Sequence, residues 1–219
     1  MKLLSKAAAV VGFALMAGTA SAAVVNFDFT SSGNNYSWTK SFTVDGVTVG
    51  VSAYNYTPAA GIGDDVALGG QIGVSQSTPG LGACSAATSP NDNNCGKNPL
   101  VDAGTAPELL KFTFSEDVTI TGILYANNDQ NDHVDYFFGP ALTFAGGFLT
   151  PQPPSRQDLS SYGPLSLFAL GNQTPSDQYR IAGLQIETSS APVVPLPASA
   201  LLLMGGVGGL AALRRRKKA

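Results

Sequence analysis

Residues 41–51, SFTVDGVTVGV, decide the fold of this chain. Phe42 and Val44 alternate with polar residues before Asp45-Gly46, and the valines at positions 47, 49 and 51 resume the alternation after it. A period of two residues is typical of a strand with one buried face, and Asp-Gly between two such runs is a strong signal for a type I′ turn. The stretch therefore predicts a β-hairpin.

The same period continues toward the C-terminus. In LLKFTF, Leu110, Phe112 and Phe114 share one face, and DVTITGILY continues the pattern with Val118 and Ile120, then with Leu124 past Gly122. Further strands are expected at VVNFDF (24–29), VALGGQIGV (66–74), DYFF (135–138), ALTFAGGFL (141–149), PLSLFAL (164–170) and QYRIAGLQIET (178–188). Some ten short strands separated by Gly, Pro, Asn and Asp predict an all-β fold, an antiparallel, jelly-roll-like β-sandwich over residues 23–190.

Two interruptions in this pattern have a local interpretation. In the last strand Tyr179 and Ile181 have one parity, whereas Leu184 and Ile186 have the other. A β-bulge at Ala182-Gly183 would place all four on one face. The proline-rich stretch 151–159, PQPPSRQDL, is the clearest loop in the chain.

The N-terminus has the pattern of an export signal. Lys2 and Lys6 precede an uncharged apolar stretch at 7–17, and Ala20-Ser21-Ala22 provides small residues in the A-x-A arrangement that signal peptidase recognises. The apolar stretch is too short to span a bilayer comfortably. We expect residues 1–22 to be a signal peptide that is cleaved after Ala22.

The C-terminal residues 191–219 form a linker, an apolar segment and a basic tail. Residues 196–213 carry no charge, and as a helix they would be about 27 Å long, close to the roughly 30 Å hydrocarbon thickness of a bilayer. A stop-transfer cluster follows, made of Arg214, Arg215, Arg216, Lys217 and Lys218. The positive-inside rule then predicts a transmembrane helix with the N-terminus outside and the C-terminus in the cytoplasm.

These three parts, in this order at the extreme C-terminus, resemble the PEP-CTERM sorting domain of Gram-negative bacteria. The chain has the VPLPA variant of the motif, Val194, Pro195, Leu196, Pro197 and Ala198, with Leu196 where the named motif has Glu. The resemblance covers about 26 residues. It implies a precursor anchored transiently in the inner membrane and processed near the motif by an exosortase that accepts this variant. No family is assigned to the ectodomain.

A eukaryotic lipid-anchor signal is an alternative interpretation of the tail, but such signals end in apolar residues. Three N-x-[S/T] sequons, at Asn35, Asn55 and Asn172, leave a eukaryotic origin open. A chain rich in Asn, Ser and Thr also forms such triplets by chance.

Charge is distributed very unevenly along the chain. Residues 23–190 contain all fifteen acidic residues and only five of the twelve basic ones, which gives this part a net charge of −10. Nucleic-acid binding requires a positively charged surface, so it is excluded as a function of this part of the chain.

The two cysteines, Cys84 and Cys95, flank a polar loop, and in an oxidising compartment they are expected to form a disulfide. That bond would add about 3 kcal/mol in the chain-entropy description.

Catalytic motifs are scarce. His133 is the sole histidine and no G-x-S-x-G motif occurs. A Ser-His-Asp triad would therefore have to use His133 and would lack the usual motif around its serine. A secreted hydrolase stays as an alternative, since fifteen carboxylates could supply a glycosidase acid pair. We do not predict an enzyme.

Two binding functions are alternatives. Residues 127–135, NNDQNDHVD, offer oxygen ligands of the kind that Ca²⁺ prefers. The candidate ligands are Asp129, Asn131, Asp132 and Asp135, joined by Asp102 and Glu108 and by Asp64 and Asp65. Carbohydrate could instead stack on aromatic side chains, here Tyr36, Trp38, Tyr54, Tyr56, Tyr136 and Tyr162.

The sequence as a whole predicts an exported structural or adhesive protein of the cell surface or of an exopolysaccharide or biofilm matrix.

Overall fold

The computed structural model describes residues 22–58, 60–85, 100–101, 106–128, 131–149, 156–172 and 177–189. Ala22–Ser190 form one compact unit. Residues 1–21, including Ala20, and the sorting segment 191–219 lie outside the described residues, as do Cys95, Asp102 and Asp129. Among the residues that are described, no helix is both long and apolar enough to span a bilayer.

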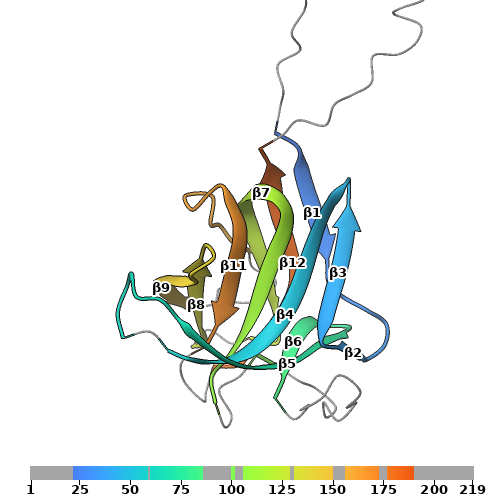
Figure 1. The fold of residues 1–219 in the computed structure, drawn as a ribbon. Coiled ribbons are helices and arrows are strands. Elements are labelled where there is room, and N and C mark those ends of the chain that lie inside the picture. Colours follow the sequence, from blue (N-terminus) through green and yellow to red (C-terminus); the bar gives the residue numbers. More distant parts are fainter. Residues whose placement is uncertain are drawn as a thin grey trace, which may run out of the picture. The chain divides into compact units, whose positions relative to one another are not determined.

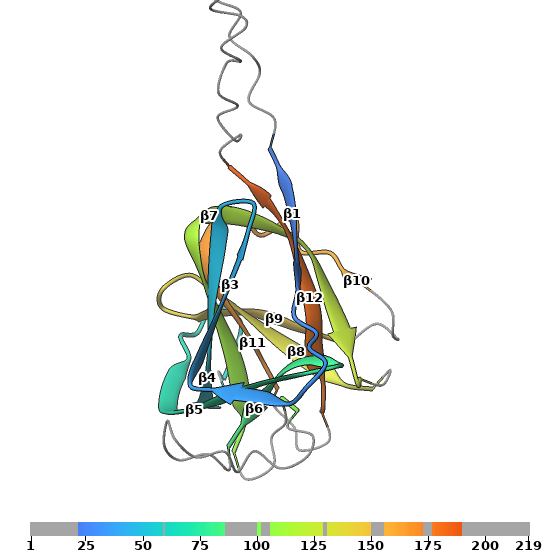
Figure 2. The same ribbon diagram turned by 90° about the vertical axis from the view of Figure 1, so that its right-hand side faces the viewer.

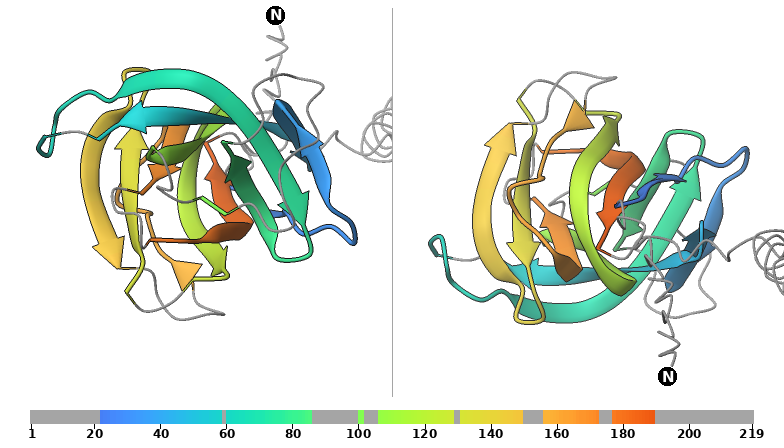
Figure 3. Two further views of the ribbon diagram at one scale, coloured as in Figure 1. Left: turned by 90° about the horizontal axis from the view of Figure 1, so that it is seen from below. Right: turned by 90° about the horizontal axis from the view of Figure 1, so that it is seen from above.

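Twelve strands form one hydrogen-bonded network, and every pairing between them is antiparallel. They are β1 (Val24–Asp28), β2 (Asn35–Ser37), β3 (Thr39–Val44), β4 (Val47–Thr57), β5 (Ala67–Ser77), β6 (Gly80–Cys84), β7 (Glu108–Ala126), β8 (His133–Phe138), β9 (Thr143–Leu149), β10 (Arg156–Gln157), β11 (Leu165–Gly171) and β12 (Arg180–Thr188). The prediction of an all-β antiparallel fold is confirmed. The views in Figures 1 and 3 show β8 and β9 on the flank opposite β1 and β3.

The hairpin predicted from residues 41–51 is formed by β3 and β4. Thr43 pairs with Thr48 and Val44 with Val47, and the turn residues Asp45 and Gly46 have φ angles of 50° and 85°. Positive φ at both central positions is what a type I′ turn requires. The valines at 47, 49 and 51 are fully buried, as their alternation predicts.

β7 pairs with a different strand along each half of its length and so connects two groups of strands. Its first half, residues 108–114, pairs with β4, and its second half, residues 118–126, pairs with β12. Because β12 also pairs with β6, β6 with β5 and β5 with β4, the pairings run in a closed circuit. Figure 2 shows β7 arching over one end, so that its two halves lie on opposite sides of the interior.

The main hydrophobic core fills the space between these two halves. Phe112 stacks on Phe168 with ring centroids 4.7 Å apart, and Phe29 lies 6.0 Å from Phe112. The second half of β7 adds Val118 and Ile120 to this core. A smaller cluster lies around Tyr56, Leu109, Phe137 and Leu142.

The bulge predicted in β12 is present, because the register shifts between Ile181 and Gly183. Tyr179, Ile181, Leu184 and Ile186 are all buried as a result. A second shift, which the sequence did not reveal, lies where β7 pairs with Gln185 and Ile186.

The second shift changes which side chain of β7 enters the core. Ile123 is fully buried there, whereas Leu124 is 41% exposed, so the expectation that Leu124 continues the buried face is wrong. The proline-rich loop is also shorter than expected, because Arg156 and Gln157 form β10 and pair with Leu124 and Ile123 of β7. The guanidinium of Arg156 bonds the backbone oxygen of Thr121, and these bonds hold β10 in place.

Candidate functional site

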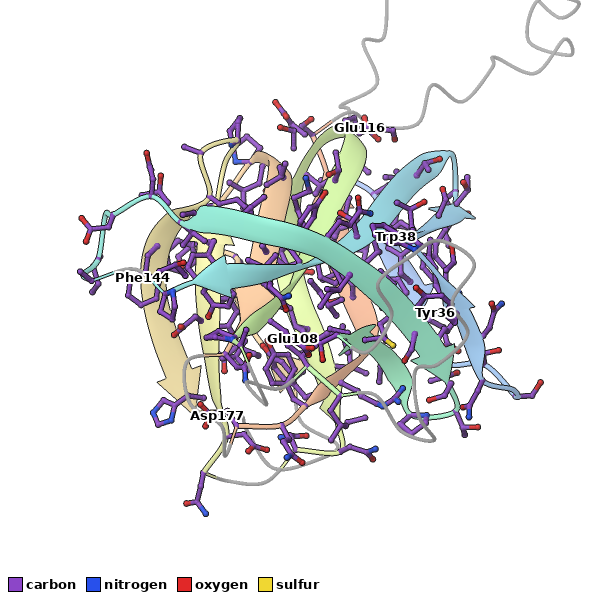
Figure 4. All side chains as sticks on the ribbon, turned by 60° about the horizontal axis from the view of Figure 1, so that its bottom comes forward. Tyr36, Trp38, Glu108, Glu116, Phe144 and Asp177 are labelled. Carbon is purple, nitrogen blue, oxygen red and sulfur yellow. The ribbon has the colours of Figure 1, made fainter. Side chains whose placement is uncertain are left out.

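Polar side chains gather where β7, β8 and β12 begin and β11 ends. Glu108, Asp132, Asp135, Asn172 and Asp177 are all buried there, each less than 5% exposed. In Figure 4, Glu108 and Asp177 lie well away from Glu116, which marks the opposite end of the domain. Burying a polar group without a hydrogen-bond partner is costly. The hydrogen bonds of these residues therefore indicate which segments of the chain the cluster connects.

Asn172 links three segments of the chain. Its side-chain oxygen accepts a hydrogen bond from the backbone N–H of Glu108 at 3.2 Å, and its amide group donates to the backbone oxygen of Asp177, also at 3.2 Å. Its backbone oxygen accepts a 2.7 Å bond from the hydroxyl of Tyr56. Asn172 therefore joins the end of β11 to the starts of β7 and β12. Its fully buried amide is also a poor glycosylation acceptor, although it lies in a sequon.

Asp132 and Asp177 form a reciprocal clasp between two strand starts. The carboxylate of Asp132 accepts a bond from the backbone N–H of Gln178, and that of Asp177 accepts one from the backbone N–H of His133, both at 3.1 Å. Each carboxylate thus satisfies a backbone donor beside the other aspartate. Charge-assisted bonds of this type are stronger than neutral ones, so the pair fixes the start of β8 against the start of β12.

Tyr56 lies in the same buried cluster, next to Asp135 and Asn172. Its hydroxyl is 3.5 Å from a carboxylate oxygen of Asp135 and donates its shorter bond to Asn172. Burial raises the pKa of Tyr56 well above its usual value, and the nearby charges of Asp135 and Asp177 raise it further. Tyr56 is therefore a neutral donor throughout the physiological pH range.

The proposed calcium ligands are only partly placed together. Asp132, Asp135 and Glu108 belong to the buried cluster, whereas Asp102 and Asp129 are not described. Among the described residues no group of three His, Cys, Asp or Glu side chains is arranged to hold a metal ion. Asp177, which the sequence analysis missed, takes a central place instead. Its carboxylate binds the backbone N–H of His133, which is 44 residues away in the sequence, so no local spacing in the sequence indicates this role.

The two remaining acidic candidates lie in the loop between β4 and β5. Asp65 accepts a bond from the hydroxyl of Thr143, and the backbone oxygen of Asp64 accepts one from the N–H of Phe144. The loop is therefore attached to β9. Asn131 lies just before the clasp, in the turn that leads to β8.

The aromatic residues do not form one stacking surface. Tyr56 and Tyr136 are buried, and the ring of Tyr162 packs against Phe138 with centroids 4.7 Å apart. The Nζ of Lys111 lies over the ring of Tyr54, 4.8 Å from its centroid. Tyr36 and Trp38, labelled in Figure 4, are on the flank away from Phe144. The sequence pattern thus identified the aromatic residues but not their separate positions.

His133 is the first residue of β8, and its side chain is 54% exposed. Its Nδ1 is 4.0 Å from a carboxylate oxygen of Asp177, which is longer than a hydrogen bond. Cys84 is buried at the end of β6, and its expected partner Cys95 is not described.

Comparisons with protein-family models, with curated proteins and with solved structures give no match to the chain.

Replacing Asn172 by Ala should lower the free energy of unfolding by about 3 kcal/mol, because the N–H of Glu108 and the backbone oxygen of Asp177 both lose buried partners. Urea unfolding followed by circular dichroism measures the change. Asn26→Ala is the matched control, since Asn26 accepts a bond from Gln185 at an exposed site and should cost less than about 0.5 kcal/mol. Equal losses in both variants would contradict the linking role of Asn172.

Proposed function

We propose that the chain is an exported cell-surface or extracellular-matrix protein that is processed by an exosortase. Its ectodomain, a jelly-roll-like β-sandwich whose two sides are joined through β7, would do structural or adhesive work, for example in an exopolysaccharide or biofilm matrix. The C-terminal sequence carries the proposal: a VPLPA motif, 18 uncharged residues from 196 to 213, and five basic residues. The implied partners are signal peptidase, the exosortase and a surface acceptor.

The boundaries of the compact unit support this proposal. After cleavage behind Ala22, the new N-terminal residue would be Ala23, whose backbone oxygen accepts a 3.0 Å bond from the N–H of Thr188. β1 then pairs with β12 over residues 24–28 and 183–187. Removal of residues 1–22, and cleavage near 194–198, would therefore cut no strand of the described domain.

The bonding of the polar cluster favours structural work. The described bonds of Asp132, Asn172 and Asp177 go mainly to backbone groups of neighbouring segments. Such bonds fix loops in place and so add to the rigidity of one end of the domain. A rigid domain is what a structural or adhesive component needs.

Intact mass of the mature protein, from cells with and without the exosortase, tests the processing. We expect the wild-type mass to lack residues 1–22 and everything beyond the motif, and to be lower by two hydrogens because Cys84 and Cys95 are oxidised. Pro195→Ala combined with Pro197→Ala should leave the tail attached, because proline restricts a chain to extended conformations and the substitutions remove that restriction from the motif.

The linker substitution Pro192→Ala is the control for this experiment and should be processed normally, because it lies outside the motif. A wild-type protein that retains its tail through Ala219 in cells with the enzyme would contradict the proposal. Labelling of two thiols in the denatured, unreduced protein would contradict the disulfide alone.

A further inference from the structure

Arg180, the first residue of β12, is a fully buried cation. Its Nη1 donates to the hydroxyl of Ser77 at 2.6 Å and to the backbone oxygen of Gly80 at 2.8 Å. Its Nε and Nη2 are also buried and have no hydrogen-bond partner in the described part of the chain. A guanidinium carries five N–H donors, so much of its bonding capacity is unused.

This arrangement is energetically unusual. Burial lowers the pKa of Arg180 through desolvation, yet a guanidinium stays charged in proteins. Buried charges are normally paired with an opposite charge. Among the described residues Arg180 has no carboxylate within ion-pair distance, and the buried carboxylate of Asp177 lies 4.0 Å from His133 instead. A positive charge with open donors therefore lacks a counter-charge within the described domain.

Ser75 adds a second unused donor beside Arg180. Its hydroxyl is buried and has no partner among the described residues. Ser75 and Ser77 are two residues apart on β5, whose pairing with β6 has no register shift, so both point to the same face. Two residues along a strand span about 7 Å, roughly twice a hydrogen-bond distance, so one ion could accept from both the Ser75 hydroxyl and the guanidinium bound at Ser77.

The backbone arrangement brings Arg180 to this face. Ile181 and Leu81 pair with each other and their side chains belong to the core, so the side chain of Arg180, the neighbour of Ile181, lies on the opposite face. A side chain at Gly80 would come within 2.3 Å of the backbone oxygen of Ile181, so the absence of a side chain lets the β5–β6 turn approach β12. The residues that pair with Ser75 and Ser77 on β6 are Gly82 and Gly80, which place no side chain over the serines.

We propose that Arg180, Ser75 and Ser77 form a binding site for a small monovalent anion, of the size of chloride or a carboxylate group. The Nε and Nη2 of Arg180 and the hydroxyl of Ser75 would donate to the anion. Nη1 keeps its bonds to Ser77 and Gly80, which hold the guanidinium in place. The ring of Tyr36, which lies over Gly73 on the same face, borders the site. The net charge of −10 on the domain favours a small monovalent anion over a polyanion.

Chloride-35 NMR line broadening on the purified full-length protein in detergent tests the site, with sodium gluconate holding the ionic strength constant. Wild type should broaden the chloride line in a saturable manner, and acetate should compete if a carboxylate fits. Arg180→Met should remove the saturable part. Ser75→Ala should weaken chloride binding about tenfold, the usual effect of losing one hydrogen bond to a charged group.

Ser75→Ala separates binding from structure. In chloride-free buffer its melting temperature should equal or exceed that of wild type, because the substitution removes a buried hydroxyl that lacks a partner. Ser41→Ala, at an exposed position of β3, is the matched control and should bind chloride as wild type does. Saturable broadening that is equal in wild type and Ser75→Ala, or absent in wild type, overturns the proposal even if Arg180→Met does not fold.

Discussion

Raising the pH from 9 to 11 should lower the free energy of unfolding by about 5 kcal/mol, because four buried tyrosines must stay neutral in the folded domain. The four are Tyr56, Tyr125, Tyr136 and Tyr179, and burial raises the pKa of each above its usual value of 10.0. In the unfolded chain all four ionise near pH 10. Their contribution to stability is therefore present below pH 10 and is lost as the pH rises beyond it.

Tyrosinate absorbance and circular dichroism, followed together through this pH range, measure the effect. The ionisation of the four tyrosines should coincide with loss of the β signal, since small domains have only about 5–15 kcal/mol of stability to lose. A folded domain in which all four tyrosines ionise would contradict the prediction.

Tyr179→Phe is an informative variant in this titration. The hydroxyl of Tyr179 is buried without a partner among the described residues, so its removal should cost little at pH 7. Above pH 10 the variant should lose stability about 1.4 kcal/mol per pH unit less steeply than wild type, because one ionising group is gone. An unchanged slope would show that Tyr179 does not contribute.

Replacing Phe112 by Ala should lower the free energy of unfolding by about 4 kcal/mol, the usual cost of truncating a buried Phe. Phe112 lies where β4, β7 and β11 meet, opposite Val51 on one side and Phe168 on the other. Its ring stacks on Phe168 with an interplanar angle of 12°. The substitution therefore removes a stacked contact as well as buried apolar area.

Urea unfolding of purified protein measures this loss. Thr113→Ala is the matched control, because Thr113 is the next residue of β7 and its side chain is exposed. The control should cost less than about 1 kcal/mol. If the two variants lose the same stability, the buried ring of Phe112 and its stacking on Phe168 do not contribute as proposed.

The sequence predicted most of the strands because alternation is a local property. The positive φ angles at Asp45 and Gly46 follow from a dipeptide, and the bulge at Ala182-Gly183 follows from a change of parity within one strand. The second register shift, between β7 and β12 at Gln185 and Ile186, is not visible in the sequence. Thr121 and Gly122 lie at this shift in β7, and either residue is compatible with the buried or the exposed face of a strand. β6 was missed because GLGAC has no alternation, being buried along its whole length.

The candidate site was less predictable for a different reason. Asp132, Asp135 and Glu108 were singled out as oxygen donors, but bonds such as that from Gln178 to Asp132 join segments far apart in the chain. Arg180 and Ser75 are separated by more than a hundred residues, and only the β5–β6 and β6–β12 pairings bring them onto one face. Composition identifies the polar residues, whereas the pairing of distant strands decides which of them meet.

The pairing of β1 with β12 determines how the domain would respond to mechanical force. The two strands run antiparallel, so Val24 pairs with Glu187, and Figure 1 shows the start of β1 beside the end of β12. A pull between the two chain ends would load the rungs of this ladder one at a time and peel β1 away. A pull between residue 188 and the far end of the domain would instead shear β12 against β1 and β7, loading many hydrogen bonds at once. A domain tethered through its C-terminus and gripped at its far end would thus be loaded along its stronger direction.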